Sequence, residues 1–112
     1  MTDKIVVLST CETAEEADRI ATALVENRLA ACVNIVPGVR SVYRWKGAVE
    51  KAEEFLLVIK TSRPLLEKAQ AEIERVHSYD LPEAIALAVV NGSEQYLEWM
   101  NSNLAQEDPD ER

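Results

Sequence analysis

Residues 31–61, ACVNIVPGVRSVYRWKGAVEKAEEFLLVIKT, decide the fold of this 112-residue chain. They contain two strand-like arms of roughly 13 residues each, joined by the tight turn Lys46-Gly47. At about 3.3 Å per residue, each arm spans on the order of 40 Å, which is about twice the usual strand length. Pro37-Gly38 predicts a bulge or bend in the first arm, because proline lacks a backbone donor and glycine tolerates unusual φ values.

A hairpin of this length extends beyond what one small sheet can cover. Its base, residues 55–59, is apolar on both faces, whereas charged side chains gather near the tip. A two-stranded ribbon is only marginally stable by itself, and its free edges invite pairing with other chains. We therefore predict a closed homo-oligomer built on this hairpin.

On both sides of the hairpin, the chain predicts two more strands and three helices. Thr13 and Glu16 form a capping box, in which the hydroxyl and the carboxylate satisfy each other's backbone donors at a helix start. Ser62 is a plausible cap for the next helix, with Pro64 in its first turn. The predicted elements are a strand over 5–11, a helix over 13–27, a helix over 62–76, a strand over 84–90 and a helix over 93–103.

This order of elements indicates the fold class. Strand-helix-strand-strand-helix-strand is the split arrangement of a ferredoxin-like α+β domain, here with an extra C-terminal helix. Right-handed crossovers put both main helices on one face of a four-stranded antiparallel sheet. We expect a single domain over residues 1–112, with a core over about 4–104 and an acidic tail over 105–112 that frays.

The amino-acid composition limits the kinds of binding partner to expect. Twenty acidic against twelve basic residues give a formal charge of -8, which repels phosphate backbones and anionic lipids and attracts cations. Nucleic acid and membrane surfaces are therefore not expected partners. No segment approaches the roughly 20 apolar residues of a membrane span. Two cysteines, Cys11 and Cys32, do not make a disulfide framework, so we expect a cytoplasmic protein.

The sequence does not indicate an enzyme. The predicted third strand lacks the aromatic signature of an RNA-recognition module. The loop after the first strand, residues 10–13, is acidic and has no glycine, which argues against a phosphate-binding loop. No serine or cysteine has a motif that marks an activated nucleophile. We expect neither catalysis nor an obligatory cofactor.

The segment HSYDLPE, residues 77–83, is the candidate site for a cation. It places the only histidine beside a phenol and carboxylates, and neutral imidazole and carboxylate are ligands for divalent metals. Two structural alternatives stay open. His77 would also suit the negative C-terminal end of the second helix, and Glu83 and Tyr79 would also pair with Lys60.

Several of these stretches together resemble the CutA divalent-cation tolerance family. The resemblance is carried by LAACVNI (29–35) before Pro37-Gly38, SVYRWKG (41–47), IKT (59–61), HSYDLPE (77–83) and YLEW (96–99). It spans nearly the whole chain, from about residue 5 to residue 104. It implies a ferredoxin-like subunit, a tight homotrimer resembling the PII signalling proteins, and a cytoplasmic role in tolerance of copper and other divalent ions.

The resemblance also implies site residues. The family pattern His-Pro-Tyr-x-x-Pro-Glu is matched at His77, Tyr79, Pro82 and Glu83, while Ser78 replaces the first proline. His77 and Glu83 are then the expected ligands for copper or another divalent cation. The expected cleft between subunits is lined by Lys60, His77, Tyr79 and Glu83, and Trp45 is a further binding candidate, although packing between subunits is the more ordinary role for it. The alternative is a PII-like regulatory or scaffold trimer that binds a small anion or a partner protein in that cleft.

Overall fold

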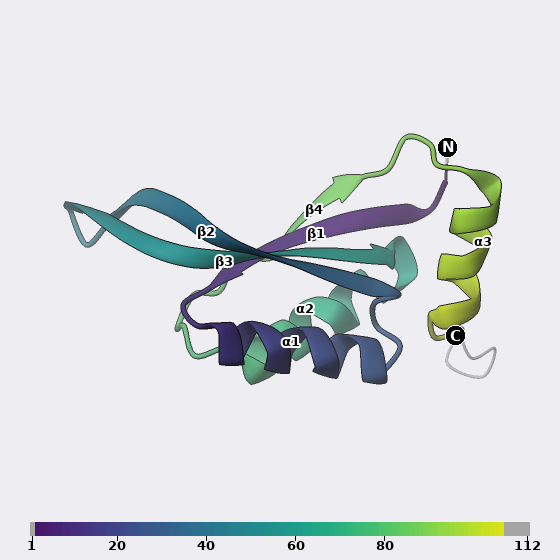
Figure 1. Ribbon diagram of the computed structural model, residues 1–112, viewed down its shortest axis with the longest axis horizontal. Coiled ribbons are helices and arrows are strands. Elements are labelled where there is room, and N and C mark those ends of the chain that lie inside the picture. The colour runs from purple at the N-terminus through teal and green to yellow at the C-terminus, as the bar shows by residue number, and fades with distance from the viewer. Residues whose placement is uncertain (1, 107–112) are drawn as a thin grey trace.

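The computed structural model describes residues 2–106 and contains one four-stranded antiparallel sheet with helices on one face (Figure 1). The sheet order is β2-β3-β1-β4. This confirms the predicted ferredoxin-like α+β class. The elements are β1 (Lys4–Cys11), α1 (Ala14–Glu26), β2 (Cys32–Trp45), β3 (Ala48–Ser62), a 3-10 turn (Arg63–Leu65), α2 (Leu66–Val76), β4 (Ile85–Ala88) and α3 (Glu94–Asn103).

The core lies between α1, α2 and the sheet face that the two helices cover. Alternate residues of β1 and β3 point into it, as the period of two in a strand requires. Small and branched apolar residues of α1 fill the other side of the core at helical spacing. The largest fully buried apolar side chains are Val7, Ile20, Leu24, Leu57, Ile59 and Ile73.

The long hairpin is present as predicted. β2 has 14 residues and β3 has 15. Their register shifts between Val36 and Val39, where Gly38 adopts φ 73°, so the predicted bulge is confirmed. At the turn, Lys46 and Gly47 both have positive φ, as a tight hairpin requires. Figure 1 shows the hairpin extending well beyond the helices.

The fourth strand differs from its prediction in length. β4 covers only Ile85–Ala88 instead of residues 84–90, and its four residues are exposed. It pairs with β1 from Ile5 to Leu8, and the last contact of this ladder is the Val89 amide donating to the Lys4 carbonyl. Because β1 begins at Lys4, the chain beyond Val89 has no strand to pair with.

The helix starts also differ in part. The Thr13 hydroxyl accepts a hydrogen bond from the Glu16 amide at 3.1 Å, as expected, but the Glu16 carboxylate turns to the Ser78 amide, so the predicted capping box is wrong in its second half. Ser62 makes no side-chain capping bond. Pro64 instead lies in a 3-10 turn that precedes α2.

Helix α3 packs at the end of the sheet opposite the hairpin tip (Figure 1). Met100 and Leu104 are buried there against Ala31 and Leu65. Among the described helices, none is both long and apolar enough to cross a membrane. The predicted fraying of the acidic tail falls mainly on residues 107–112, which lie outside the described residues.

Candidate functional site

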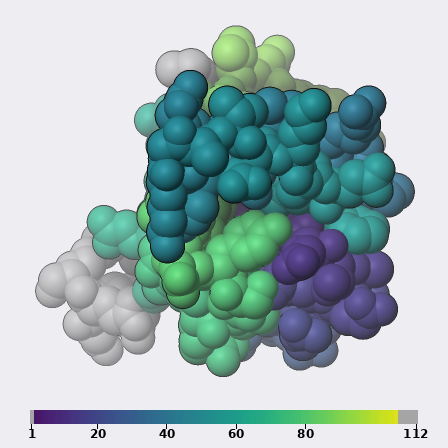
Figure 2. All heavy atoms as spheres, turned by 90° about the vertical axis from the view of Figure 1, so that its left-hand side faces the viewer, coloured from purple at the N-terminus to yellow at the C-terminus, as the bar shows by residue number. Residues whose placement is uncertain are grey.

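A pocket of about 580 Å³ opens between the hairpin and the loop that leads from α2 to β4. Figure 2 views the molecule from this end, with the hairpin above the green loop segment. Four segments supply its walls: the end of β1, the outer part of β2, one residue of β3 and the loop. The lining residues are Thr10, Ser41, Val42, Tyr43, Trp45, Glu54, Tyr79, Asp80, Leu81 and Glu83.

Alternation along β2 explains most of the hairpin residues that line the pocket, with Val42 of the opposite face as the exception. Ser41, Tyr43 and Trp45 lie on one face of β2, as the sequence predicts, and all three line the pocket. Glu54 of β3 lies opposite Val39 of β2, and Val39 is on the same face of β2 as Ser41. The bulge at Pro37-Gly38 sets this register, so a local feature of the sequence determines which side chains meet the loop.

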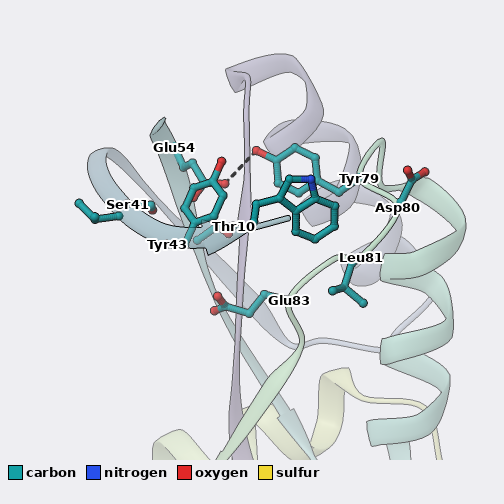
Figure 3. Close-up of a pocket in the computed structure, with 10 residues that line it drawn as sticks. Thr10, Ser41, Tyr43, Glu54, Tyr79, Asp80, Leu81 and Glu83 are labelled. Atoms are coloured by element: carbon teal, nitrogen blue, oxygen red, sulfur yellow. Dashed lines mark hydrogen bonds between the residues drawn. The ribbon is translucent and has the colours of Figure 1, made fainter. Parts of the chain in front are cut away.

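Tyr79 and Glu54 form the central polar contact of the pocket (Figure 3). The Tyr79 hydroxyl donates to Glu54 Oε2 at 2.8 Å. Burial and the Glu54 carboxylate raise the pKa of Tyr79, so the phenol stays protonated and remains a donor. Glu54 is only 7% exposed. It is one of the charged side chains that the sequence places near the hairpin tip, and Tyr79 of the loop contacts it.

Glu83 lies in the same pocket and is half-buried. Burial raises its pKa, and the nearby charge of Glu54 raises it further, because two carboxylates repel each other in their ionised forms. The described residues that line the pocket include three acidic side chains and no basic one. The pocket is therefore suited to a positively charged ligand.

His77 is buried beside the pocket, with both ring nitrogens engaged. Nε2 lies 2.7 Å from the Thr10 carbonyl oxygen, and Nδ1 accepts a hydrogen bond from the Tyr79 amide at 3.1 Å. This pattern assigns the proton of the neutral ring to Nε2, which donates to Thr10. His77 ends α2 through its backbone, whereas its ring fastens the loop to β1.

Glu16 supplies a second attachment for the loop. Its Oε2 accepts from the Ser78 amide at 3.0 Å, and its Oε1 lies 3.8 Å from His77 Nδ1. Burial acts to raise the pKa of Glu16, but the hydrogen bonds from Ser78, together with smaller effects of His77 and the Glu12 backbone, lower it overall. This role of Glu16 was not predicted from the sequence. The available signal was an acidic residue on the buried side of the first helix turn.

Of the two remaining candidate residues, Lys60 lies away from the pocket and Trp45 lines it. The Lys60 ammonium lies 5.6 Å from the centre of the Tyr96 ring, near α3. It is six residues from Glu54 along β3, a separation of roughly 20 Å. The predicted pairing of Lys60 with Glu83 or Tyr79 is therefore not formed within the described chain, because Tyr79 bonds Glu54 instead. Trp45 lines the pocket.

The predicted ligands His77 and Glu83 do not form a ready metal centre in one chain. Among the described residues, no group of three or more His, Cys, Asp and Glu side chains is arranged to hold a metal ion. The His77 ring would have to give up one of its two hydrogen bonds before it could ligate. Their role as ligands stays a prediction.

Comparison with known proteins connects this geometry to a family. The family model described as CutA1 divalent ion tolerance protein matches residues 5–103. The chain belongs to this family. The match includes both walls of the pocket, so the hairpin and the 77–83 loop are parts of the CutA1 domain.

Individual CutA relatives agree with the family match. The divalent-cation tolerance protein CutA of Thermus thermophilus is 47% identical over 98 residues, which cover 88% of this chain and 95% of that protein. The chloroplastic CutA of Arabidopsis thaliana is 46% identical over 99 residues, covering 88% of this chain. The chain spans only about half of the plant protein's length, 54%.

Solved CutA structures share the fold. The Thermus thermophilus structure superimposes with a TM-score of 0.89 at 45% identity, covering 91% of this chain and 99% of that one. The Oryza sativa CutA1 structure gives a TM-score of 0.90 at 42% identity, covering 93% and 95% of the two chains. The predicted fold is thus confirmed at the level of whole-chain superposition.

Proposed function

We propose that this CutA1-family chain is a non-enzymatic cytoplasmic homotrimer that contributes to tolerance of divalent cations, copper among them. The family and its solved relatives are named for divalent-cation tolerance and not for a reaction. Burial raises the pKa of the Cys11 thiol to about 11, so this cysteine is not an activated nucleophile at neutral pH. Both cysteines are free, which suits a reducing compartment.

The open face of the sheet is the observation that carries the proposal of a trimer. Figure 1 shows α1 and α2 on the other face. Leu8 pairs with Val58 and Ile85, and Val6 with Leu87, so these side chains share the open face. Ile85 is 56% exposed and Leu87 is 49% exposed. Such a contiguous apolar surface marks an interface, since burying it contributes about 25 cal/mol per Å².

A cation bound by this protein would meet the carboxylates of the pocket first. Glu83 is the predicted ligand best placed to do so, because burial and the charge of Glu54 disfavour its ionised form and a bound cation would relieve the repulsion from Glu54. One chain holds no complete set of metal ligands among its described residues. We therefore propose that a second copy, or a rearranged His77 ring, completes the coordination.

Mass measurement tests the assembly. At micromolar concentration, light scattering should give about three times the 12.5 kDa chain mass. Leu87→Asp places a charge on the open face and should reduce the mass to that of a smaller species. Val25→Asp is the matched control, because Val25 is 41% exposed on α1 and should leave the mass unchanged. A wild-type monomer would contradict the trimer.

Calorimetry with copper and zinc tests the metal site. The double variant His77→Ala, Glu83→Ala should lose most of the binding heat of the wild type, whereas Glu53→Ala, at an exposed neighbour of Glu54, should retain it. Equal heats for the wild type and the double variant would place metal binding elsewhere. Circular dichroism of each variant checks that the fold is kept.

Lys60 favours a second candidate, a regulatory trimer that binds a small anion or a partner protein between subunits. Its ammonium lies over the Tyr96 ring and not beside a carboxylate, so its charge is not neutralised by an ion pair among the described residues. Titration with inorganic phosphate should then give saturable heat that Lys60→Met abolishes. Lack of any heat with the wild type would remove phosphate-like anions from consideration.

A further inference from the structure

The pocket between the hairpin and the 77–83 loop combines aromatic walls with one buried carboxylate, Glu54, and one half-buried carboxylate, Glu83. We infer that it binds a small organic ammonium ion, a ligand class distinct from the divalent metals of the proposed function. Three observations support this inference. Three aromatic rings line the pocket, the buried carboxylate of Glu54 has no cationic partner among the described residues, and other walls of the pocket are apolar.

Aromatic side chains are concentrated in this pocket. The chain has only six Phe, Trp and Tyr residues, and three of them, Tyr43, Trp45 and Tyr79, line it. Figure 3 shows Tyr43 and Tyr79 on opposite sides of the space. The negative faces of aromatic rings attract cations, and Trp and Tyr do so most strongly. Rings from two separate segments can therefore contact one ammonium group from two sides.

Glu54 supplies the charge that a cation would neutralise. Its side chain lies in the pocket wall and is 7% exposed, yet its only hydrogen bond from the described side chains comes from the neutral Tyr79 phenol. The ion pairs among the described residues do not include it. A buried carboxylate without a cationic partner is costly and uncommon. A bound ammonium ion would supply that partner.

The other walls suit the alkyl groups of an organic cation, which a metal ion lacks. Val42 and Leu81 add apolar surface, which would contact alkyl substituents and would give nothing to a hydrated ion. The described residues provide no cluster of three metal-binding side chains. The volume of about 580 Å³ falls within the range usual for pockets that hold small organic ligands.

A pair of probes with the same shape tests the inference. Choline carries a trimethylammonium group, and 3,3-dimethylbutan-1-ol replaces the charged nitrogen with carbon. Calorimetry on the full chain, in the presence of EDTA to exclude metals, should show saturable choline binding that is about tenfold or more tighter than binding of the neutral alcohol. Equal affinity for the two probes, or no choline binding, would overturn the inference.

Two neighbouring glutamates provide matched variants. Glu54→Gln and Glu53→Gln remove the same charge from adjacent positions, but only Glu54 is buried in the pocket wall. Choline affinity should fall about tenfold in Glu54→Gln and stay unchanged in Glu53→Gln. A similar loss in both would mean that choline senses only net charge, which would contradict a specific site.

Trp45→Leu is a second variant, which tests the inference even if Glu54→Gln does not fold. Trp45 is 43% exposed near the hairpin tip, so Trp45→Leu preserves apolar bulk and removes one aromatic face with little effect on the core. Choline binding should weaken severalfold, by roughly the contribution of one ring, while binding of the neutral alcohol stays the same. Equal choline affinity in wild type and Trp45→Leu would contradict the aromatic site.

These outcomes are separate from those of the proposed function. The oligomer mass and the metal titrations do not depend on choline, and the EDTA in this assay removes any contribution from a metal. Should a neighbouring copy fill the pocket in the assembled protein, choline would not bind. That result would overturn the inference while leaving the trimer and its metal binding in place.

Discussion

The two halves of β3 have the same backbone structure and very different surroundings. Residues 48–53 are exposed or half-buried, whereas residues 54–62 are buried or half-buried throughout. Val49 in the outer half is 60% exposed, and Leu57 in the inner half is fully buried. Both pair with β2 in one antiparallel ladder. Regular hydrogen bonding alone therefore does not determine burial along this strand.

Neighbouring elements account for the difference. The inner half also pairs with β1, from Phe55 to Ser62, and α1 covers the face that carries Leu57. The outer half has β2 as its only neighbouring strand in the described chain. A two-stranded ribbon gains little from packing within its own chain, so substitutions in the outer half should cost less stability than those in the inner half. Glu54 marks the boundary between the two environments.

The largest expected effect is a cavity in the inner half. Leu57→Ala should lower the free energy of unfolding by about 2–5 kcal/mol, since it removes a fully buried side chain from the core. Val49→Ala, the control in the outer half, should cost less than about 1 kcal/mol. Urea denaturation measures both. A loss at Val49 as large as that at Leu57 would show that another copy of the chain covers the outer half.

A smaller effect is expected at the boundary itself. Tyr79→Phe removes the hydroxyl that donates to buried Glu54 and should cost about 1–3 kcal/mol, because the carboxylate oxygen loses its partner. Tyr43→Phe is the matched control, since Tyr43 is 44% exposed in the same pocket and its hydroxyl bonds no described residue. Equal stabilities of the two variants in urea would contradict a structural role for the Tyr79–Glu54 bond.

The smallest effect concerns the loop that covers the boundary, and it depends on pH. The pKa of Glu16 is lowered in the folded protein despite its burial, because Ser78 donates to its carboxylate. Its contribution to stability is therefore present above the unfolded pKa of about 4.3 and is lost as pH falls through the lower, folded value. Glu16→Gln should cost about 1 kcal/mol at pH 7 and progressively less below about pH 4.

Urea denaturation across this pH range compares Glu16→Gln with the wild type and with Glu15→Gln, an exposed residue in the same helix turn. Glu15→Gln should follow the wild type at each pH. A constant difference between Glu16→Gln and the wild type from pH 7 to pH 3 would show that the Glu16 charge does not hold the loop.

Much of the site could be anticipated because its parts are local. The alternation of Ser41, Tyr43 and Trp45 predicted a common face, and that face lines the pocket. His77, Tyr79 and Glu83 were predicted as one candidate segment. Tyr79 and Glu83 line the pocket, and His77 is buried beside it. Their partners were not anticipated, because Glu54, Thr10 and Glu16 come from three other elements.

Periodicity, turn residues and apolar runs determined the elements, the bulge at Pro37-Gly38 and the fold class, because each of these depends on neighbours within a few positions in the chain. Only the tertiary structure decided that β4 ends at Ala88, that Glu16 turns from Thr13 to Ser78, and that Glu54 is buried under Tyr79. Those outcomes depend on where β1 begins and on how the 77–83 loop contacts β1, α1 and β3. They are long-range contacts, for which sequence spacing carries no signal.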